Sequence, residues 1–238
     1  MRKPSFFLLA SLLASPLAHG QIFQRELGDF DLKLGSTPSR SMAQGLVKPS
    51  ASGSFHGGLD LSHDSGWYIG QWSPSMGLGE SNDLEVDSYL GFKHPFDQTL
   101  GYEVGMIQYS YPQLAPQDSQ EFYGGLTLLG SRFGAAFSQD PDKRNSTLFA
   151  DLGGNPPFGI GVSIKYTTHQ LGSPASVSNG YVSSFNDWSI KLSRPWMGID
   201  LKLIYSDSSL NGSDCSAYSG HNAQCDSLLT FKAEHSFY

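Results

Sequence analysis

The chain has 238 residues, of which 39% are hydrophobic and 16% are charged, and its net charge at pH 7 is −7. This acidic balance argues against a nucleic-acid-binding surface. The mean hydropathy is −0.27 and no apolar run of membrane-spanning length follows the N-terminal segment, which excludes a helical membrane protein. Composition is even beyond that segment, so we expect one domain.

The first 20 residues have the pattern of a secretory signal peptide. Arg2 and Lys3 form a positively charged start, and the apolar run "FFLLASLLASPLA" is too short to span a membrane. The tripeptide "AHG" at 18–20 supplies the small residues that precede a cleavage site. We therefore expect residues 1–20 to be removed on export and residues 21–238 to form the mature domain.

Short segments that alternate apolar and polar residues recur along the mature chain, as is typical of β-strands. In "FGIGVSIKYTTHQ", residues 158–170, apolar side chains alternate with glycine, serine, lysine and threonine. The connections are too short for parallel crossovers, so the strands should be antiparallel. The pattern predicts about twelve strands, at 30–36, 53–62, 67–73, 83–93, 99–110, 120–129, 131–139, 146–153, 158–169, 182–193, 197–207 and 227–237.

The predicted connections alternate between short and long. Short ones include "HDSG", "HPFDQ", "NPPF" and "RPW", and longer ones include "SPSMGLGESN", "PQLAPQDSQ", "DPDKRN" and "LGSPASVSNGY". Bacterial outer-membrane barrels have tight periplasmic turns and longer extracellular loops. The sequence therefore predicts an all-β fold, a closed antiparallel transmembrane β-barrel of about twelve strands in the bacterial outer membrane, with both termini in the periplasm.

Aromatic residues and the last strand favour the same location. Several aromatic side chains fall near predicted strand ends, where outer-membrane barrels carry interfacial girdles. The final segment "LLTFKAEHSFY" alternates and ends on an aromatic residue, a feature that the barrel-assembly machinery reads. Outer-membrane lipid and this machinery are thus the expected partners. The candidate girdle residues are Trp67, Trp72, Tyr109, Tyr111, Trp188 and Trp196.

The polar positions of the strands would face the lumen of such a barrel. Acidic residues gather on the earlier strands and most basic ones on the later strands. One interpretation is a charged constriction through which small polar solutes diffuse passively. The other is a lumen filled by paired charges, in a closed barrel that acts structurally or through its extracellular loops. The candidate lumen residues are Asp60, Glu85, Asp87, Glu103, Glu121, Arg132, Lys165, Lys191, Asp200, Lys202, Lys232 and Glu234.

The cysteines and histidines give no sign of catalysis. Cys215 and Cys225 in an exported chain predict a disulfide, because their spacing around His221 matches no zinc motif. The other histidines are scattered singly and are expected at solvated or interfacial positions. No hydrolase, metalloprotease or nucleotide-binding motif occurs. We therefore predict that the protein is not an enzyme and needs no metal or cofactor.

Several segments resemble a known family, the small outer-membrane porins of the TorF type. They are "GGLDLSHDSGWYIGQWSPSMG" (57–77), "NDLEVDSYLGFK" (82–93), "LGYEVGMIQYSYP" (100–112), "EFYGGLTL" (121–128) and "DWSIKLSRPWMGIDLKLIYSDS" (187–208). The family opens with an aromatic, arginine-containing strand, whereas "FDLKLGSTPSRSMAQG" here offers only Arg40. The resemblance implies an exported porin, and its motifs specify no solute.

Overall fold

The structure is a computed structural model, and it describes ten ranges of the chain. The expected signal peptide lies outside them. The described residues are 21–35, 42–46, 57–76, 84–112, 118–140, 142–152, 159–178, 180–210, 214–215 and 227–235.

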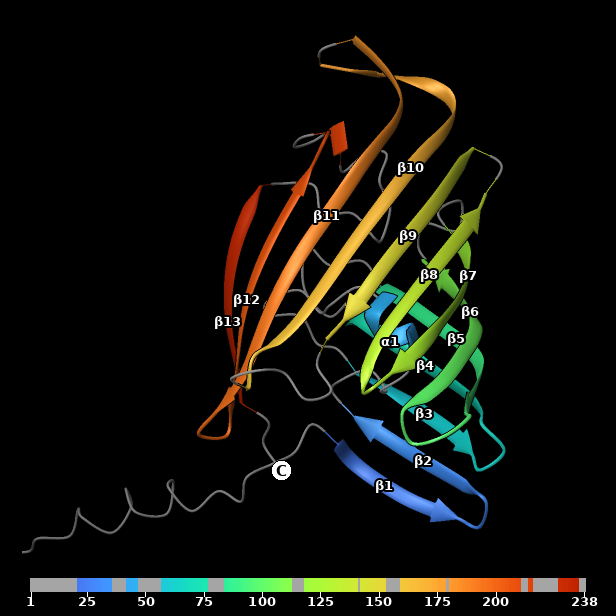
Figure 1. Ribbon diagram of the computed structural model, residues 1–238. Helices are drawn as coiled ribbons and strands as arrows, with labels where there is room; N and C mark the ends of the chain where they lie inside the picture. The colour runs from blue at the N-terminus through green and yellow to red at the C-terminus, as the bar shows by residue number, and fades with distance from the viewer. Residues whose placement is uncertain are drawn as a thin grey trace, which may run out of the picture.

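The described residues form one antiparallel sheet in which each strand pairs with its neighbours in the sequence (Figure 1). This confirms the expected all-β, antiparallel class. The strands are β1 (Gln21–Leu27), β2 (Phe30–Gly35), β3 (Gly57–His63), β4 (Trp67–Met76), β5 (Leu84–Pro95), β6 (Leu100–Ser110), β7 (Ser119–Leu128), β8 (Ser131–Gln139), β9 (Lys143–Asp151), β10 (Gly161–Val177), β11 (Gly180–Trp196), β12 (Ile199–Ser208) and β13 (Leu228–His235).

Twelve of the strands, β2 to β13, correspond to the twelve that the alternation predicts. β1 is an additional strand that pairs with β2, from Leu27 opposite Phe30 to Gln21 opposite Gly35. Within the described residues, β1 and β13 are the two edges of a 13-stranded sheet. The sheet curves strongly from β1 round to β13 (Figure 1).

Three of the predicted connections were wrong, because strands continue through them. β11 runs through "RPW" to Trp196, and the turn to β12 falls at Met197 and Gly198. β9 begins at Lys143, inside the expected loop "DPDKRN". β10 and β11 continue through most of "LGSPASVSNGY", and their pairing resumes after an irregularity with Ala175 opposite Val182. At the other end, β10 begins at Gly161 because Gly159 has a φ of 68° and starts no strand. Long and short connections therefore alternate less regularly than expected.

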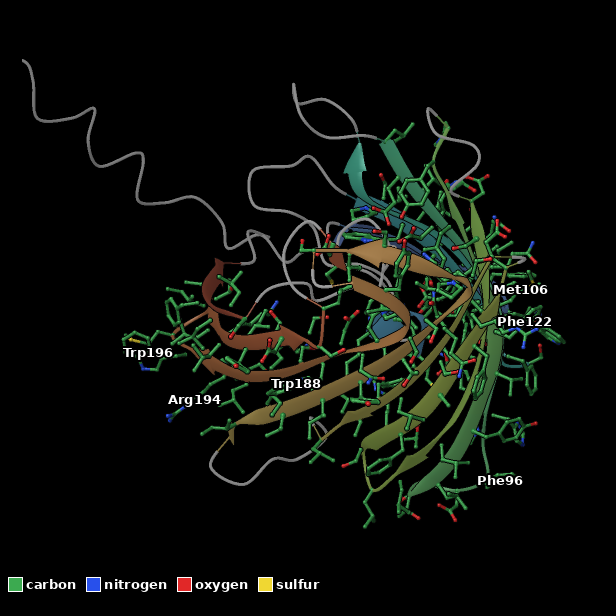
Figure 2. All side chains as sticks on the ribbon, turned by 90° about the horizontal axis from the view of Figure 1, so that it is seen from above. Phe96, Met106, Phe122, Trp188, Arg194 and Trp196 are labelled. Atoms are coloured by element: carbon green, nitrogen blue, oxygen red, sulfur yellow. The ribbon has the colours of Figure 1, made fainter. Side chains whose placement is uncertain are left out.

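The two faces of the sheet have opposite chemistry, and we name them by the curvature. On the concave face, Glu121 and Thr167 are completely buried although both are polar. On the convex face, large apolar side chains are exposed, with Phe122 at 59% and Leu148 at 59%. Figure 2 shows Met106 and Phe122 pointing outward from the curve. The alternation along each strand thus separates a polar inner face from an apolar outer face.

A short helix, α1 (Met42–Leu46), lies inside the curve of the sheet and contacts β6, β7 and β8 (Figure 1). Met42, Ala43 and Leu46 are all completely buried. They pack on the concave face against a set of aromatic side chains. No helix in the described part of the chain has the length and apolar character needed to cross a membrane.

Glycines on the concave face lie opposite aromatic residues of the next strand. Tyr68 is directly opposite Gly91, and a Cβ added at Gly91 would overlap the Tyr68 ring and lie 2.8 Å from the Tyr123 hydroxyl. The aromatic rings thus lie over glycine backbone, which has no side chain. This arrangement permits both tight curvature of the sheet and close packing of the rings. The other pairs are Gly70 with Tyr89, Gly105 with Tyr123, and Gly134 with Phe149.

Substituting Gly91 with alanine should therefore destabilise the protein by about 1–3 kcal/mol, because the added methyl group overpacks the inner face. Gly124→Ala is the matched control, since a Cβ at Gly124 finds its nearest neighbour, the Val104 side chain, at 3.6 Å. The measurement is the urea-unfolding midpoint of each refolded variant in detergent. Equal midpoints for the two variants would contradict this account of the glycine–aromatic pairs.

Candidate functional site

The first half of the concave face carries carboxylates held by tyrosine hydroxyls. The Tyr68 hydroxyl donates to Glu103 Oε1 at 2.5 Å and also contacts the Tyr123 hydroxyl. Tyr109 donates to Glu121 Oε2 at 2.9 Å. These buried carboxyl groups therefore accept hydrogen bonds from neutral hydroxyl donors, which satisfies them in a buried position. Two more such bonds join Tyr89 to Asp60 at 2.9 Å and Tyr111 to Glu85 at 3.0 Å.

The second half of the concave face carries the bases. Arg132 on β8 forms a 2.5 Å ion pair with Asp151 on the neighbouring strand β9. Lys165 on β10 donates to the carbonyl oxygen of Leu46 at 3.4 Å and lies within electrostatic reach of Glu121. Lys191 and Lys202 are half-buried on β11 and β12. Most of the acids thus lie on β3–β7 and most of the bases on β8–β12, where Asp151 and Asp187 are also present.

The structure places nine of the twelve candidate lumen residues on the concave face with buried or half-buried side chains. These are Asp60, Glu85, Asp87, Glu103, Glu121, Arg132, Lys165, Lys191 and Lys202. The other three are placed by backbone register, with Asp200 opposite Glu234 and Lys202 opposite Lys232. Cys215 is completely buried, and Cys225 lies outside the described residues, so the disulfide stays a prediction.

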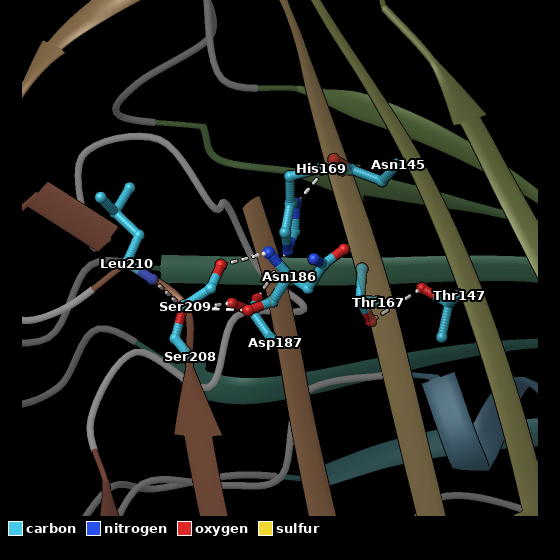
Figure 3. Close-up of polar contacts among 9 residues, drawn as sticks. All are labelled: Asn145, Thr147, Thr167, His169, Asn186, Asp187, Ser208, Ser209 and Leu210. Carbon is cyan, nitrogen blue, oxygen red and sulfur yellow. Dashed lines mark hydrogen bonds and ion pairs between the residues drawn. The ribbon is translucent and has the colours of Figure 1, made fainter. Parts of the chain in front are cut away.

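A buried polar network on β9–β12 was not predicted (Figure 3). His169 is completely buried, with Nδ1 2.8 Å from Asn145 Oδ1 and Nε2 2.6 Å from Asp187 Oδ2. The Ser208 hydroxyl donates to the other oxygen of Asp187 at 2.8 Å. Phe185 stacks on the imidazole with ring centroids 4.5 Å apart. Both ring nitrogens and both carboxylate oxygens therefore have partners, which a buried polar group requires.

The prediction that the histidines are solvated or interfacial was wrong for His169. The alternation of β10 could have found it, because His169 continues the polar series that contains Lys165 and Thr167. Asp187 likewise shares the polar face of β11 with Lys191. Three girdle predictions were also wrong. Trp72 is 2% exposed and Tyr109 is completely buried within the concave-face cluster, and Tyr111 packs against that cluster with its hydroxyl on Glu85.

The network does not form a nucleophile–base pair. The Ser208 hydroxyl bonds to Asp187, and the described hydrogen bonds join His169 to Asn145 and Asp187. Nucleophilic catalysis needs the base within hydrogen-bond reach of the hydroxyl that it activates. Among the residues that the structure describes, no group of three histidine, cysteine or acidic side chains could hold a metal ion. The arrangement orders a wall of the concave face.

The outer end of β10 and β11 extends beyond β9 and β12 and closes over a small apolar cluster. Phe185 and Leu210 are buried there with Cys215, and Leu171, Val177 and Val182 pack against them. The Ser178 amide and hydroxyl donate to Asp214 at 2.9 and 2.6 Å. These hydrogen bonds, the hydroxyl bond foremost, hold the pKa of Asp214 below its usual value. They fix Asp214, next to Cys215, to the tip of the hairpin.

Fold and site together define an all-β protein whose single sheet carries its polar residues inside and its apolar residues outside. The family model of Gcw_chp, described as a bacterial protein of unknown function, matches residues 43–237. The chain belongs to this family. The match runs from α1 to the end of β13 and so includes every strand except β1 and β2. Neither the curated proteins nor the solved structures gave a match.

Proposed function

We propose that the sheet closes into a barrel in the bacterial outer membrane and that its concave face lines a narrow pore for passive diffusion of small hydrophilic solutes. The observation that carries the proposal is the inverted distribution of polarity. Glu121 and Asp87 are completely buried, whereas Phe122 and Leu126 are more than half exposed. Exposure of so many apolar side chains to water is unfavourable, whereas in a membrane the same face contacts lipid hydrocarbon.

The aromatic residues at the short-turn end support a membrane interface. Trp67 and Trp196 are each 55% exposed, and Phe96 is 62% exposed. Neighbouring rings pack together. The ring centroids of Trp67 and Phe92 are 5.1 Å apart, and those of Phe96 and Tyr102 are 5.3 Å apart. Amphipathic rings collect at the level of the lipid head groups. This band would place the short turns at one surface of the bilayer.

The separation of charge on the concave face supports a pore for polar solutes. Carboxylates bound by tyrosines lie on β3–β7, and Lys165, Lys191 and Lys202 lie on the facing strands. Opposite charges across a narrow lumen create a transverse field that orients and selects polar solutes. The resemblance to TorF-type porins agrees with this proposal.

The test is the single-channel conductance of refolded protein in planar lipid bilayers. We expect discrete current steps and a measurable reversal potential in a salt gradient. A heat-modifiable gel shift serves as the control for folding. Protein that remains monomeric and folded in buffer without detergent would contradict the membrane location itself.

A second candidate is a closed barrel that acts structurally or through its outer surface. The observation that favours it is the filling of the concave face, where α1 packs against the aromatic cluster. Burial of Ile107 and Tyr109 in the same cluster fills the space further. Folded protein that inserts into bilayers and yields no resolvable current would select this candidate over the pore.

Reversing a charge on the basic wall should change ion selectivity. Lys191 is half-buried on the concave face of β11. In Lys191→Glu we expect the reversal potential to shift towards cation selectivity, because the local field changes sign. The control is Lys202→Arg, which keeps the charge. An unchanged reversal potential in a conducting Lys191→Glu protein would show that this wall does not line the conducting path.

A further inference from the structure

We infer that α1 is the constriction of the proposed pore and sets the largest solute that can pass. This inference rests on the proposed function, because it assigns the size limit of that same lumen. α1 lies inside the curve of the sheet and does not pair with any strand of the described sheet (Figure 1). It can therefore move without breaking the hydrogen bonds that hold the strands together.

The ends of α1 are held from opposite walls. The backbone amide of Met42, at the first residue of the helix, donates to Glu103 Oε1 at 2.7 Å. At the last residue, the carbonyl oxygen of Leu46 accepts from Lys165 Nζ at 3.4 Å. A carboxylate at the start of a helix and an ammonium group at its end both complement the unpaired backbone groups and the helix dipole. α1 thus lies between the acidic and the basic walls.

The concave face also provides a seat for the helix. Gly125 on β7 leaves room for it, because a Cβ added there would lie 2.6 Å from Cε of Met42. Met42, Ala43 and Leu46 are buried against Tyr68, Tyr109 and the other members of the concave-face cluster. An α-helix with its side chains is about 10 Å across, so α1 would occupy a large part of the lumen if this sheet closes into a barrel.

Size selection follows from this placement. The side chains of Met42 and Leu46 are completely buried in the seat, so a passing solute must use the space beside the helix. Glu103 and Lys165 act as positioning residues, because they hold the helix that forms the constriction. Loss of the helix from its seat would widen the lumen and leave the sheet intact.

The test compares wild-type protein with Leu46→Asp and with a deletion of residues 42–46, both in planar bilayers. Leu46→Asp places a charge in the buried apolar seat and should expel the helix. Because an object about 10 Å across leaves the lumen, we expect the single-channel conductance to rise about twofold or more in both variants. The size of polyethylene glycol that can enter the pore and lower the conductance should rise in parallel. Leu46→Met keeps the volume and polarity and is the matched control.

Three outcomes are distinguishable. Higher conductance with a larger polymer cut-off in both variants, and wild-type values in Leu46→Met, supports the constriction. A conducting wild type whose conductance and cut-off equal those of both folded variants overturns the inference and leaves the pore standing. Absence of current from wild type, Leu46→Asp and the deletion variant alike overturns the pore, and the constriction falls with it. The heat-modifiable gel shift verifies folding in each case.

Discussion

Replacing Ile164 with arginine should prevent stable insertion of the protein into lipid vesicles. Ile164 is 43% exposed on the convex face of β10, between Val162 and Tyr166 on the same face. An arginine that faces lipid near the middle of a bilayer costs about 2–4 kcal/mol, and lost apolar contact adds to this. The measurement is the free energy of unfolding in vesicles by urea titration, followed by tryptophan fluorescence.

The control is the same substitution near the end of the apolar band. Ser184 lies opposite Gln170, farther along the hairpin and on the convex face. Since the cost of arginine falls to about 0–1 kcal/mol near the interface, Ser184→Arg should insert almost normally. Equal unfolding energies for the two arginine variants would mean that the convex face does not contact lipid.

The second large effect is expected at Asp187. Asp187→Ala removes the partner of His169 Nε2 and the acceptor of the Ser208 hydroxyl, within a network that is almost fully buried. Each of the two buried groups left without its partner costs about 1–3 kcal/mol, because its desolvation is no longer compensated. We expect the urea-unfolding midpoint in detergent to fall accordingly.

Ser208→Ala is the control for Asp187→Ala, because it removes one hydrogen bond and keeps the contact between His169 and Asp187. A single hydrogen bond contributes about 1 kcal/mol, so the midpoint of Ser208→Ala should fall much less. Similar midpoints for both variants would show that the buried contact of His169 with Asp187 does not stabilise the sheet.

The strands and their faces were predictable from the sequence, because alternation has a period of two. "MGIDLKLIYS" correctly places Leu203 on the convex face and Lys202 on the concave one. Strand ends were less predictable, since backbone pairing can continue through residues that favour turns. β10 continues beyond Pro174 because its pairing with β11 resumes at Ala175, after residues 171–174, which have no partner in β11. β1 was not predicted because its sequence alternates little, and it forms a strand by pairing with β2.

The charged wall was predictable in outline, and its internal contacts were not. Alternation assigns Glu103 and Lys165 to the inner face, yet nothing local indicates that α1 would lie between them. Two long-range contacts hold it there. Met42 and Glu103 are 61 positions apart in the sequence, and Leu46 and Lys165 are 119 positions apart. Likewise Trp72 and Tyr109 looked interfacial because of their place near strand ends. Their burial depends on the glycines and carboxylates of neighbouring strands, which only the sheet register brings together.

The described sheet has an odd number of strands, which limits how its two edges could join. Because neighbouring strands alternate in direction, β1 and β13 run the same way, whereas β2 and β13 run in opposite directions. An antiparallel seam of the kind found in bacterial barrels therefore requires the outer edge of β2, which β1 occupies. β1 and β13 are thus competitors for one edge within a single molecule. The outcome of this competition depends on their effective concentrations, so the length of the connections before β2 and β13 becomes a determinant of assembly.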